Sequence, residues 1–222
     1  MRPLSLFRPR RAVYLVIDDG PSEWTLELLS RLEPAGHRAV LFVLGCQVEG
    51  REEIMVEALR RGFALGNHSF NHPHFSAISR REAREEIEQT ETLIELAHTR
   101  ARVKRRSKWF RFPYLDAGEQ SFGDLQALLG ELGFSRPPAV GRRLGDEDKS
   151  RLDWQTTLNT LDWSLPDEGE LRGDLRLARP GDVIEFHDKR ETIERYASAL
   201  VEELAALSLR GVVPGQDFGI LQ

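Results

Sequence analysis

The stretch VIDDGPSEW, residues 16–24, connects the end of a β-forming run to two adjacent carboxylates and a Gly-Pro turn. Val13 to Ile17 have the apolar, β-branched character of a buried strand. Asp18 and Asp19 follow directly, and the apolar residues from Glu23 to Leu32 have helical spacing. A buried strand that leads through a polar turn into an amphipathic helix is one β/α unit. The two like charges repel each other, so their position at the end of a strand needs a chemical reason.

The alternation of strand and helix repeats along the chain. Apolar runs bounded by turn residues predict further strands over 38–45, 63–67, 108–114, 156–163 and 182–188. Helical spacing predicts further helices over 51–61, 79–99, 123–132 and 192–209. This order indicates an α/β fold with a parallel sheet, either open and doubly wound or closed as a β/α barrel. In both folds, the residues that carry chemistry lie at the carboxyl ends of the strands.

Length and composition are typical of one soluble globular domain. The chain has 222 residues, of which 40% are hydrophobic and 30% are charged. This length and hydrophobic fraction are enough to form one sizeable core. Its apolar runs are too short to span a membrane, and residues 1–11 lack the apolar segment of an export signal. We therefore expect a cytoplasmic protein. Cys46 is the single cysteine, which excludes an internal disulfide, and we expect it to be a buried structural thiol.

Charge does not favour a nucleic-acid partner. The net charge is −5, and the basic clusters RPRR (8–11) and RVKRRSK (102–108) lack the interleaved aromatic residues of a nucleic-acid surface. We expect both clusters to be solvated faces. The polar, irregular segment 135–151 is expected to be a surface excursion.

Two histidines suggest a metal site. His68 and His72 are four residues apart in a loop-forming stretch after a predicted strand, and Pro73 ends any turn there. Two imidazoles with one carboxylate are a common catalytic zinc set, and three protein ligands leave a position for water. Taken separately, the histidines could instead be surface residues, and the aspartate pair could cap the following helix.

Five short polar or aromatic stretches follow one another along the chain: IDDGP (17–21), HSFNHP (68–73), RFPY (111–114), LDW (161–163) and EFHD (185–188). Together they resemble the five motifs of the polysaccharide deacetylase family, also known as NodB-homology or carbohydrate esterase family 4 proteins. The resemblance runs from about Ala12 to about Val213, so we expect a single domain over 1–222. It implies a distorted (β/α) barrel and metal-dependent removal of N-acetyl, sometimes O-acetyl, groups from glycans such as chitin oligomers, peptidoglycan or xylan.

The resemblance also implies a division of labour between the two aspartates. Asp19, His68 and His72 match the metal ligands of the family, and Asp18 matches its general base. Zinc is the expected ion for this ligand set, although related sites accept Co²⁺, Ni²⁺ or other divalent ions. His74 falls outside the motif and is expected to be a surface or supporting group.

Other motif residues match the groups that assist the reaction. Arg111 matches the arginine that orients the base, so we expect a salt bridge to Asp18. His187 matches the general acid that protonates the departing amine. Tyr114 matches a tyrosine whose backbone N–H helps to polarise the acetyl carbonyl, and Pro113 fixes the backbone that leads to it.

Two Asp-Trp pairs compete for the fourth motif. We choose Asp162-Trp163 because it ends a predicted strand, whereas Asp153-Trp154 precedes that strand. Asp162 is then expected to orient His187, and Trp163 to line the sugar groove.

Glu185 departs from the family pattern, which usually has an apolar residue here, against the acetyl methyl group. A carboxylate facing a methyl group costs desolvation unless it is paired. Glu185 could pair with an arginine, bind a polar part of the substrate, or point away from the site.

Two other functions remain open at this stage. One alternative is an amidohydrolase that acts on a small non-polymeric amide. It is favoured by the unusual Glu185 and by the lack of an export signal. The chain could also be a glycan-binding homologue without turnover, although its candidate ligands, base and acid are all present.

Overall fold

The computed structural model describes residues 11–118, 121–137 and 151–215. Its strands are parallel and lie in the order β3-β2-β1-β5-β4, and β6 pairs with the start of β1. Their bounds are β1 Ala12–Gly20, β2 Ala39–Val43, β3 Ala64–Asn67, β4 Leu158–Asn159, β5 Val183–His187 and β6 Arg210–Gly211. The predicted α/β fold with a parallel sheet is therefore confirmed.

The strand pairings follow a closed but irregular circuit, as in a barrel. The end of β3 continues the sheet through a single bridge from Asn67 to Phe110, and Phe110 bridges in turn to Asp153. Asp153 leads within a few residues into β4, which pairs with β5. The predicted strand over 108–114 is therefore wrong as a regular element. It contributes two isolated bridges, both at Phe110, and then turns at Pro113, which lacks a backbone N–H for a sheet hydrogen bond.

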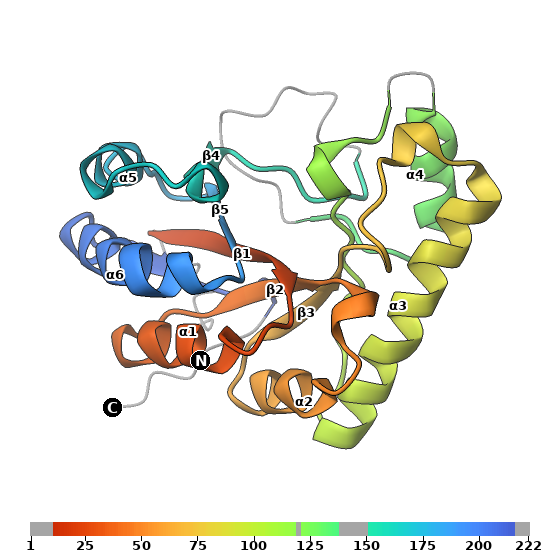
Figure 1. Cartoon of the computed structure of the whole chain (residues 1–222), viewed down its shortest axis with the longest axis horizontal. Helices are drawn as coiled ribbons and strands as arrows, with labels where there is room; N and C mark the ends of the chain where they lie inside the picture. Colours follow the sequence, from red (N-terminus) through yellow and green to blue (C-terminus); the bar gives the residue numbers. More distant parts are fainter. Residues whose placement is uncertain (1–10, 119–120, 138–150, 216–222) are drawn as a thin grey trace, which may run out of the picture.

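Helices surround the sheet in the spatial order α5, α6, α1, α2, α3, α4 (Figure 1). Their bounds are α1 Thr25–Leu32, α2 Glu52–Arg60, α3 Arg80–Ala101, α4 Phe122–Glu131, α5 Glu168–Leu175 and α6 Ala197–Ala206. The long helix α3 begins at the predicted serine cap, where Ser79 and Glu82 form a reciprocal capping box. Within the described parts of the chain, no helix combines the length and apolar character needed to cross a membrane.

Side-chain alternation along β1 separates two cores. Val13, Leu15 and Ile17 face the helices and join the large outer core. Val16 faces the inside, where it packs in a second core that includes the fully buried Trp154. Because successive strand residues point to opposite faces, Asp18 continues the inward-facing row beyond Val16. The barrel interior is thus apolar at its centre and becomes polar at the carboxyl ends of its strands.

Three local expectations differ from the structure. Helix α5 was not predicted, although Asp167 and Glu170 form a capping box at its start. The predicted helix over 192–209 begins as a π-helical segment, Thr192–Tyr196, before α6. Cys46 is exposed and not buried, because it lies in a short 3₁₀ turn beyond the end of β2. Most of the predicted excursion over 135–151 and of the cluster RPRR lies outside the described residues.

Candidate active site

A cavity of about 670 Å³ opens at the carboxyl ends of the strands. The sequence-predicted site residues line it, with the exceptions of Asp162 and Pro113. Their segments lie far apart in the sequence and meet here because parallel strands end at the same edge of a sheet. The cavity is therefore the place to look for the predicted chemistry.

Three predicted ligands converge on one side of this cavity. Asp19 Oδ1 lies 3.6 Å from His68 Nε2 and 3.3 Å from His72 Nε2. One ligand atom from each of the three residues lies within 4.8 Å of the other two. Asp19 Oδ1 is buried and accepts no hydrogen bond from the described residues. A buried carboxylate oxygen without a donor, facing two imidazole nitrogens, fits a cation.

His68 is prepared to bind through one nitrogen. Its Nδ1 lies 2.8 Å from the backbone oxygen of Arg111, and donation to that carbonyl leaves Nε2 with a free lone pair toward Asp19. Burial lowers the pKa of His68 to about 3, so the ring is neutral near pH 7. Burial also lowers the pKa of His72. Neutral imidazoles are the form that binds metal ions.

The loop between the two histidines is shaped by residues that the sequence reasoning missed. Asn67 accepts a hydrogen bond from the backbone N–H of Ser69 at 2.8 Å, and Ser69 Oγ accepts one from the backbone N–H of His72 at 3.1 Å. Ser69 and His72 both have left-handed backbone conformations, with φ of 72° and 61°. Such conformations are costly outside glycine and persist when the surroundings hold them.

Glu86, on α3, holds the same loop from outside. Its carboxylate accepts hydrogen bonds from the backbone N–H groups of Phe70 and Asn71, at 2.8 and 2.7 Å. It also accepts one from the side-chain amide of Asn71. A glutamate in a charged helix gives no sequence signal of this contact, because only the fold brings α3 to the loop.

Asp18 is the buried carboxylate next to the three candidate metal ligands. It is 2% exposed, and its Oδ2 accepts a hydrogen bond from Arg111 Nε at 2.6 Å, which is the expected salt bridge. Asp18 Oδ1 is buried and has no hydrogen-bond partner in the part of the chain that the structure describes. Arg111 is also buried, and although burial opposes its charge, the carboxylates beside it raise its pKa. One oxygen of Asp18 is thus fixed by a permanent cation, and the other is free to accept a proton.

The capping alternative for the aspartate pair is wrong for α1. The N-cap of this helix is Trp24, and no side chain of the described residues caps it. The start of the helix is instead held by Asp188, which accepts hydrogen bonds from Ser22 Oγ at 2.7 Å and Thr25 Oγ1 at 2.5 Å. Asp188 is buried, which raises its pKa, and it connects the end of β5 to the turn after β1.

His187 lies opposite, at the end of β5, and pairs with Asp162. Its Nδ1 is 2.7 Å from Asp162 Oδ1, so the ring donates this proton and presents Nε2 to the cavity. Burial disfavours the imidazolium, but the hydrogen bond and charge of Asp162 outweigh it and raise the pKa of His187 to about 9. The competing Asp153 instead accepts hydrogen bonds from Gln126 and Arg151. The choice of Asp162 agrees with this geometry.

Glu185 lies one layer below His187 on the same face of β5. It is 6% exposed and accepts hydrogen bonds from Arg111 Nη2 and Thr156 Oγ1 through Oε2. Its Oε1 is 3.7 Å from His187 Nε2. The pairing with an arginine is thus present, and Glu185 also lines the cavity. Oxygens of Glu185 and Asp18 lie close enough to His187 to suggest a second cation site, but the guanidinium of Arg111 already binds both carboxylates.

Aromatic side chains form the rim of the cavity. Tyr114 is 60% exposed and Trp163 is 58% exposed, and both line the opening. His74 stacks on Tyr114 with ring centroids 4.0 Å apart and pairs with Asp116, so it is a surface group that supports the rim. Pro113 is buried beneath Tyr114, whose backbone is left-handed with φ of 57°.

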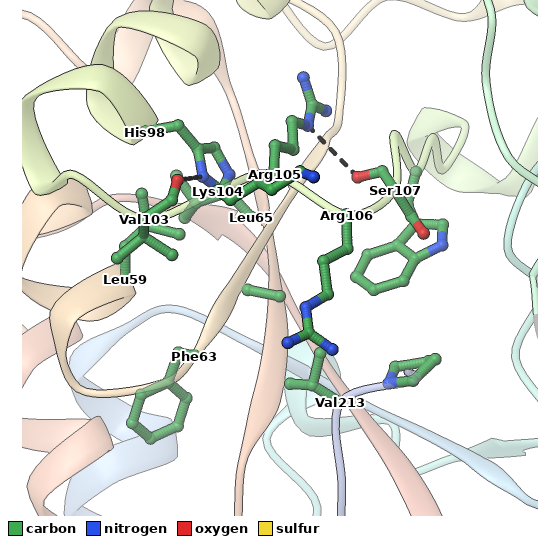
Figure 2. A pocket seen from close by; sticks show the side chains of 13 residues that line it. Leu59, Phe63, Leu65, His98, Val103, Lys104, Arg105, Arg106, Ser107 and Val213 are labelled. Atoms are coloured by element: carbon green, nitrogen blue, oxygen red, sulfur yellow. Dashed lines mark hydrogen bonds between the residues drawn. The ribbon is translucent and has the colours of Figure 1, made fainter. Parts of the chain in front are cut away.

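A second cavity, of about 300 Å³, lies near the amino end of β3, at the opposite end of the barrel (Figure 2). Lys104, Arg105 and Arg106 of the cluster RVKRRSK line it together with apolar residues. Arg105 is paired with Glu91 and Glu95, so this part of the cluster is not simply a solvated face. None of the predicted site residues lines this cavity.

Comparisons with known proteins identify the family of this chain. The family model for polysaccharide deacetylases matches residues 7–131. A chitooligosaccharide deacetylase from Sinorhizobium fredii is 28% identical over 204 residues, which cover 89% of this chain and 82% of that protein. The peptidoglycan-N-acetylmuramic acid deacetylase PdaC from Bacillus subtilis is 34% identical over 87 residues, 39% of this chain but 19% of PdaC.

A solved structure has the same fold. The family 4 carbohydrate esterase from Streptomyces lividans, in complex with acetate, has a TM-score of 0.73 and 22% sequence identity. The match covers 91% of this chain and 92% of that one. The strand and helix arrangement of the two chains is therefore shared along nearly their whole length.

Proposed function

Because the chain belongs to the polysaccharide deacetylase family, we propose that it is a metal-dependent hydrolase that removes N-acetyl, or O-acetyl, groups from a carbohydrate. A chitooligosaccharide or a peptidoglycan-type glycan is the proposed substrate, since similar proteins are named for these. One observation carries the proposal. Three candidate metal ligands line the same cavity as a buried carboxylate and a histidine that is paired with an aspartate. This combination suits hydrolysis of an amide.

We propose that Asp19, His68 and His72 hold a divalent ion, with Zn²⁺ as the first candidate. When bound, such an ion supplies Lewis acidity for the activation of water and for the charge that develops on the carbonyl oxygen. The donor set fits this role, because His68 is kept neutral and aimed by its contact to the Arg111 carbonyl.

Asp18 is the proposed general base. Its free Oδ1 accepts the proton of the attacking water while Arg111 holds Oδ2, so the carboxylate does not rotate away. The new C–O bond forms at the amide carbon on this side of the cavity.

His187 is the proposed general acid. Its Nε2–H donates to the amide nitrogen as the C–N bond breaks, and the products are a free amine and a carboxylate. Asp162 fixes the tautomer through Nδ1 and favours the protonated ring, which is the form needed for this step.

Tyr114, Pro113 and Trp163 are the proposed substrate contacts. The backbone N–H of Tyr114 stabilises the carbonyl oxygen, and Pro113 fixes the backbone before it. Trp163 offers an exposed aromatic face to a sugar ring at the mouth of the cavity.

The test is a hydrolysis assay with the full chain. The metal-free protein is reconstituted with Zn²⁺ and incubated with a tetramer of N-acetylglucosamine, and free amine and acetate are measured in equal amounts. We expect turnover that disappears with a chelator and returns with added metal. Metal-loaded protein that releases neither product from this tetramer or from a peptidoglycan fragment would contradict the proposal.

A further inference from the structure

We propose that Glu185 makes this site selective for acyl groups that end in a hydrogen-bond donor, so that it removes a hydroxyacetyl group in preference to an acetyl group. The inference rests on the proposed hydrolase function and names the acyl class for the same site. It follows from how Glu185 is held, from where its free oxygen lies, and from what that oxygen can bind.

Glu185 is held firmly through one oxygen. Oε2 accepts hydrogen bonds from Arg111 Nη2 and from Thr156 Oγ1, and both partners lie inside the barrel wall. Arg111 is itself fixed by Asp18 and by the backbone oxygen of Trp154. The carboxylate therefore has one engaged oxygen and one orientation.

The other oxygen remains available to a ligand. Oε1 accepts no hydrogen bond from the described residues, and His187 Nε2 lies 3.7 Å from it, which is beyond hydrogen-bond distance. Glu185 nevertheless lines the catalytic cavity. A carboxylate oxygen that faces a cavity and has no protein donor favours a ligand that supplies one.

The acyl end of the substrate is the part that reaches this oxygen. Glu185 and Arg111 are 6% and 1% exposed and form the floor of the cavity, whereas Tyr114 and Trp163 stand exposed at its mouth. In the proposed binding mode the sugar ring lies against the exposed aromatic residues at the mouth, and the acyl group extends toward the floor. The reacting carbon must lie between Asp18 and His187, and the side chain of Glu185 projects from the layer beneath them.

An acetyl and a hydroxyacetyl group differ by one hydroxyl, and this hydroxyl decides how each group interacts with Glu185. An acetyl group puts a methyl beside Oε1 and removes water from it without replacement, which costs free energy. A hydroxyacetyl group puts its hydroxyl there, and this hydroxyl donates a hydrogen bond to the carboxylate. The hydrolysis is otherwise unchanged: the water oxygen bonds to the acyl carbon, the C–N bond breaks, and the products are hydroxyacetate and the amine.

The experiment compares three acyl groups on one sugar. A glucosamine tetramer is fully N-acylated with hydroxyacetyl, acetyl or formyl groups, and kcat/KM of the metal-loaded protein is measured for each. We expect the hydroxyacetyl tetramer to exceed the acetyl tetramer by about tenfold, since a hydrogen bond to a charged group has that effect. A formyl tetramer that exceeds both would indicate selection by size and would overturn the proposal.

Variants of Glu185 are expected to change the ratio of kcat/KM for the hydroxyacetyl tetramer to kcat/KM for the acetyl tetramer, and not only the overall rate. In Glu185→Gln, the amide oxygen takes the contacts of Oε2 and an NH₂ donor faces the cavity, so we expect the hydroxyacetyl preference to be lost. In Glu185→Leu we expect acetyl to be preferred. The ratio within one variant is insensitive to a general loss of activity, and Glu27→Gln, on the exposed face of α1, is the matched control.

The outcomes separate this inference from the function on which it rests. If the acetyl tetramer is hydrolysed as fast as the hydroxyacetyl tetramer and Glu185→Leu leaves the ratio unchanged, selection by Glu185 is wrong and the deacetylase remains. If no acylated tetramer reacts although metal is bound, both are wrong. If Glu185→Leu does not fold, the ratio measured in Glu185→Gln tests the inference: an unchanged hydroxyacetyl preference would contradict it.

Discussion

Asp162 holds His187 at two points with one carboxylate: Oδ1 lies 2.7 Å from the ring Nδ1, and Oδ2 accepts the backbone N–H of His187 at 2.9 Å. Thr192 adds a third contact by donating its hydroxyl to Oδ2. The ring of His187 is therefore fixed both in tautomer and in position relative to β5. The ring contact and the charge of Asp162 outweigh burial and raise the pKa of the proposed acid.

The first prediction concerns pH. In the metal-free protein we expect His187 to titrate near pH 9, and Asp162→Asn to lower this pKa, because the charge that favours the imidazolium is removed. NMR titration of the histidine rings measures both values. Because the pKa is raised in the folded state from 6.5 to about 9, the stability that the pair contributes is full below about pH 6.5 and is lost as the pH rises through 9. A His187 pKa below 6.5 in the intact protein would contradict the assignment.

The second prediction separates the two aspartates. Asp18→Asn is expected to keep the metal and lower kcat by roughly two to four powers of ten, because the amide cannot accept the proton of water. Metal content by mass spectrometry and turnover are measured on the same sample. Full activity in this variant would remove Asp18 from the role of base.

The third prediction concerns the metal ligands. His72→Ala and Asp19→Asn are each expected to lower bound metal and activity together, since each removes one of three protein ligands. Equilibrium dialysis with Zn²⁺ gives the stoichiometry. His74→Ala is the matched control, because this neighbouring histidine pairs with Asp116 outside the cluster. Unchanged zinc binding in both ligand variants would place the metal elsewhere.

The fourth prediction tests the support of the ligand loop. Glu86→Gln removes a charged acceptor from the backbone N–H groups of Phe70 and Asn71, so we expect zinc affinity to fall by about tenfold or more with little change in thermal stability. Glu85→Gln is the control, because the neighbouring Glu85 pairs with Arg81 on the exposed face of α3. Equal zinc affinities in the two variants would show that Glu86 does not position the loop.

Much of this site could be predicted because its residues lie in short local motifs. The strand before Asp18 and the cap at Ser79 are visible in apolar spacing and residue type alone. The contacts of Glu86 and the pairing of Glu185 depend on elements that meet only in the folded chain, and no local pattern reports them. The wrong strand over 108–114 has the same origin, since its apolar residues fill a barrel wall that is paired there only by the two isolated bridges at Phe110.

The two isolated bridges at Phe110 also form a weakly paired seam in the barrel wall. Around it, the wall is held by only a few backbone hydrogen bonds, among them Arg111 N–H to the Asn67 carbonyl and Trp154 N–H to the Phe110 carbonyl. Arg111 and the residue that precedes His68 are both part of this seam. Local opening of the wall at this point would release the guanidinium from Asp18, the proposed base, and His68 from its place among the proposed metal ligands at the same time. The geometry of the proposed site thus depends on a weakly paired part of the wall, and we expect heat inactivation to precede global melting.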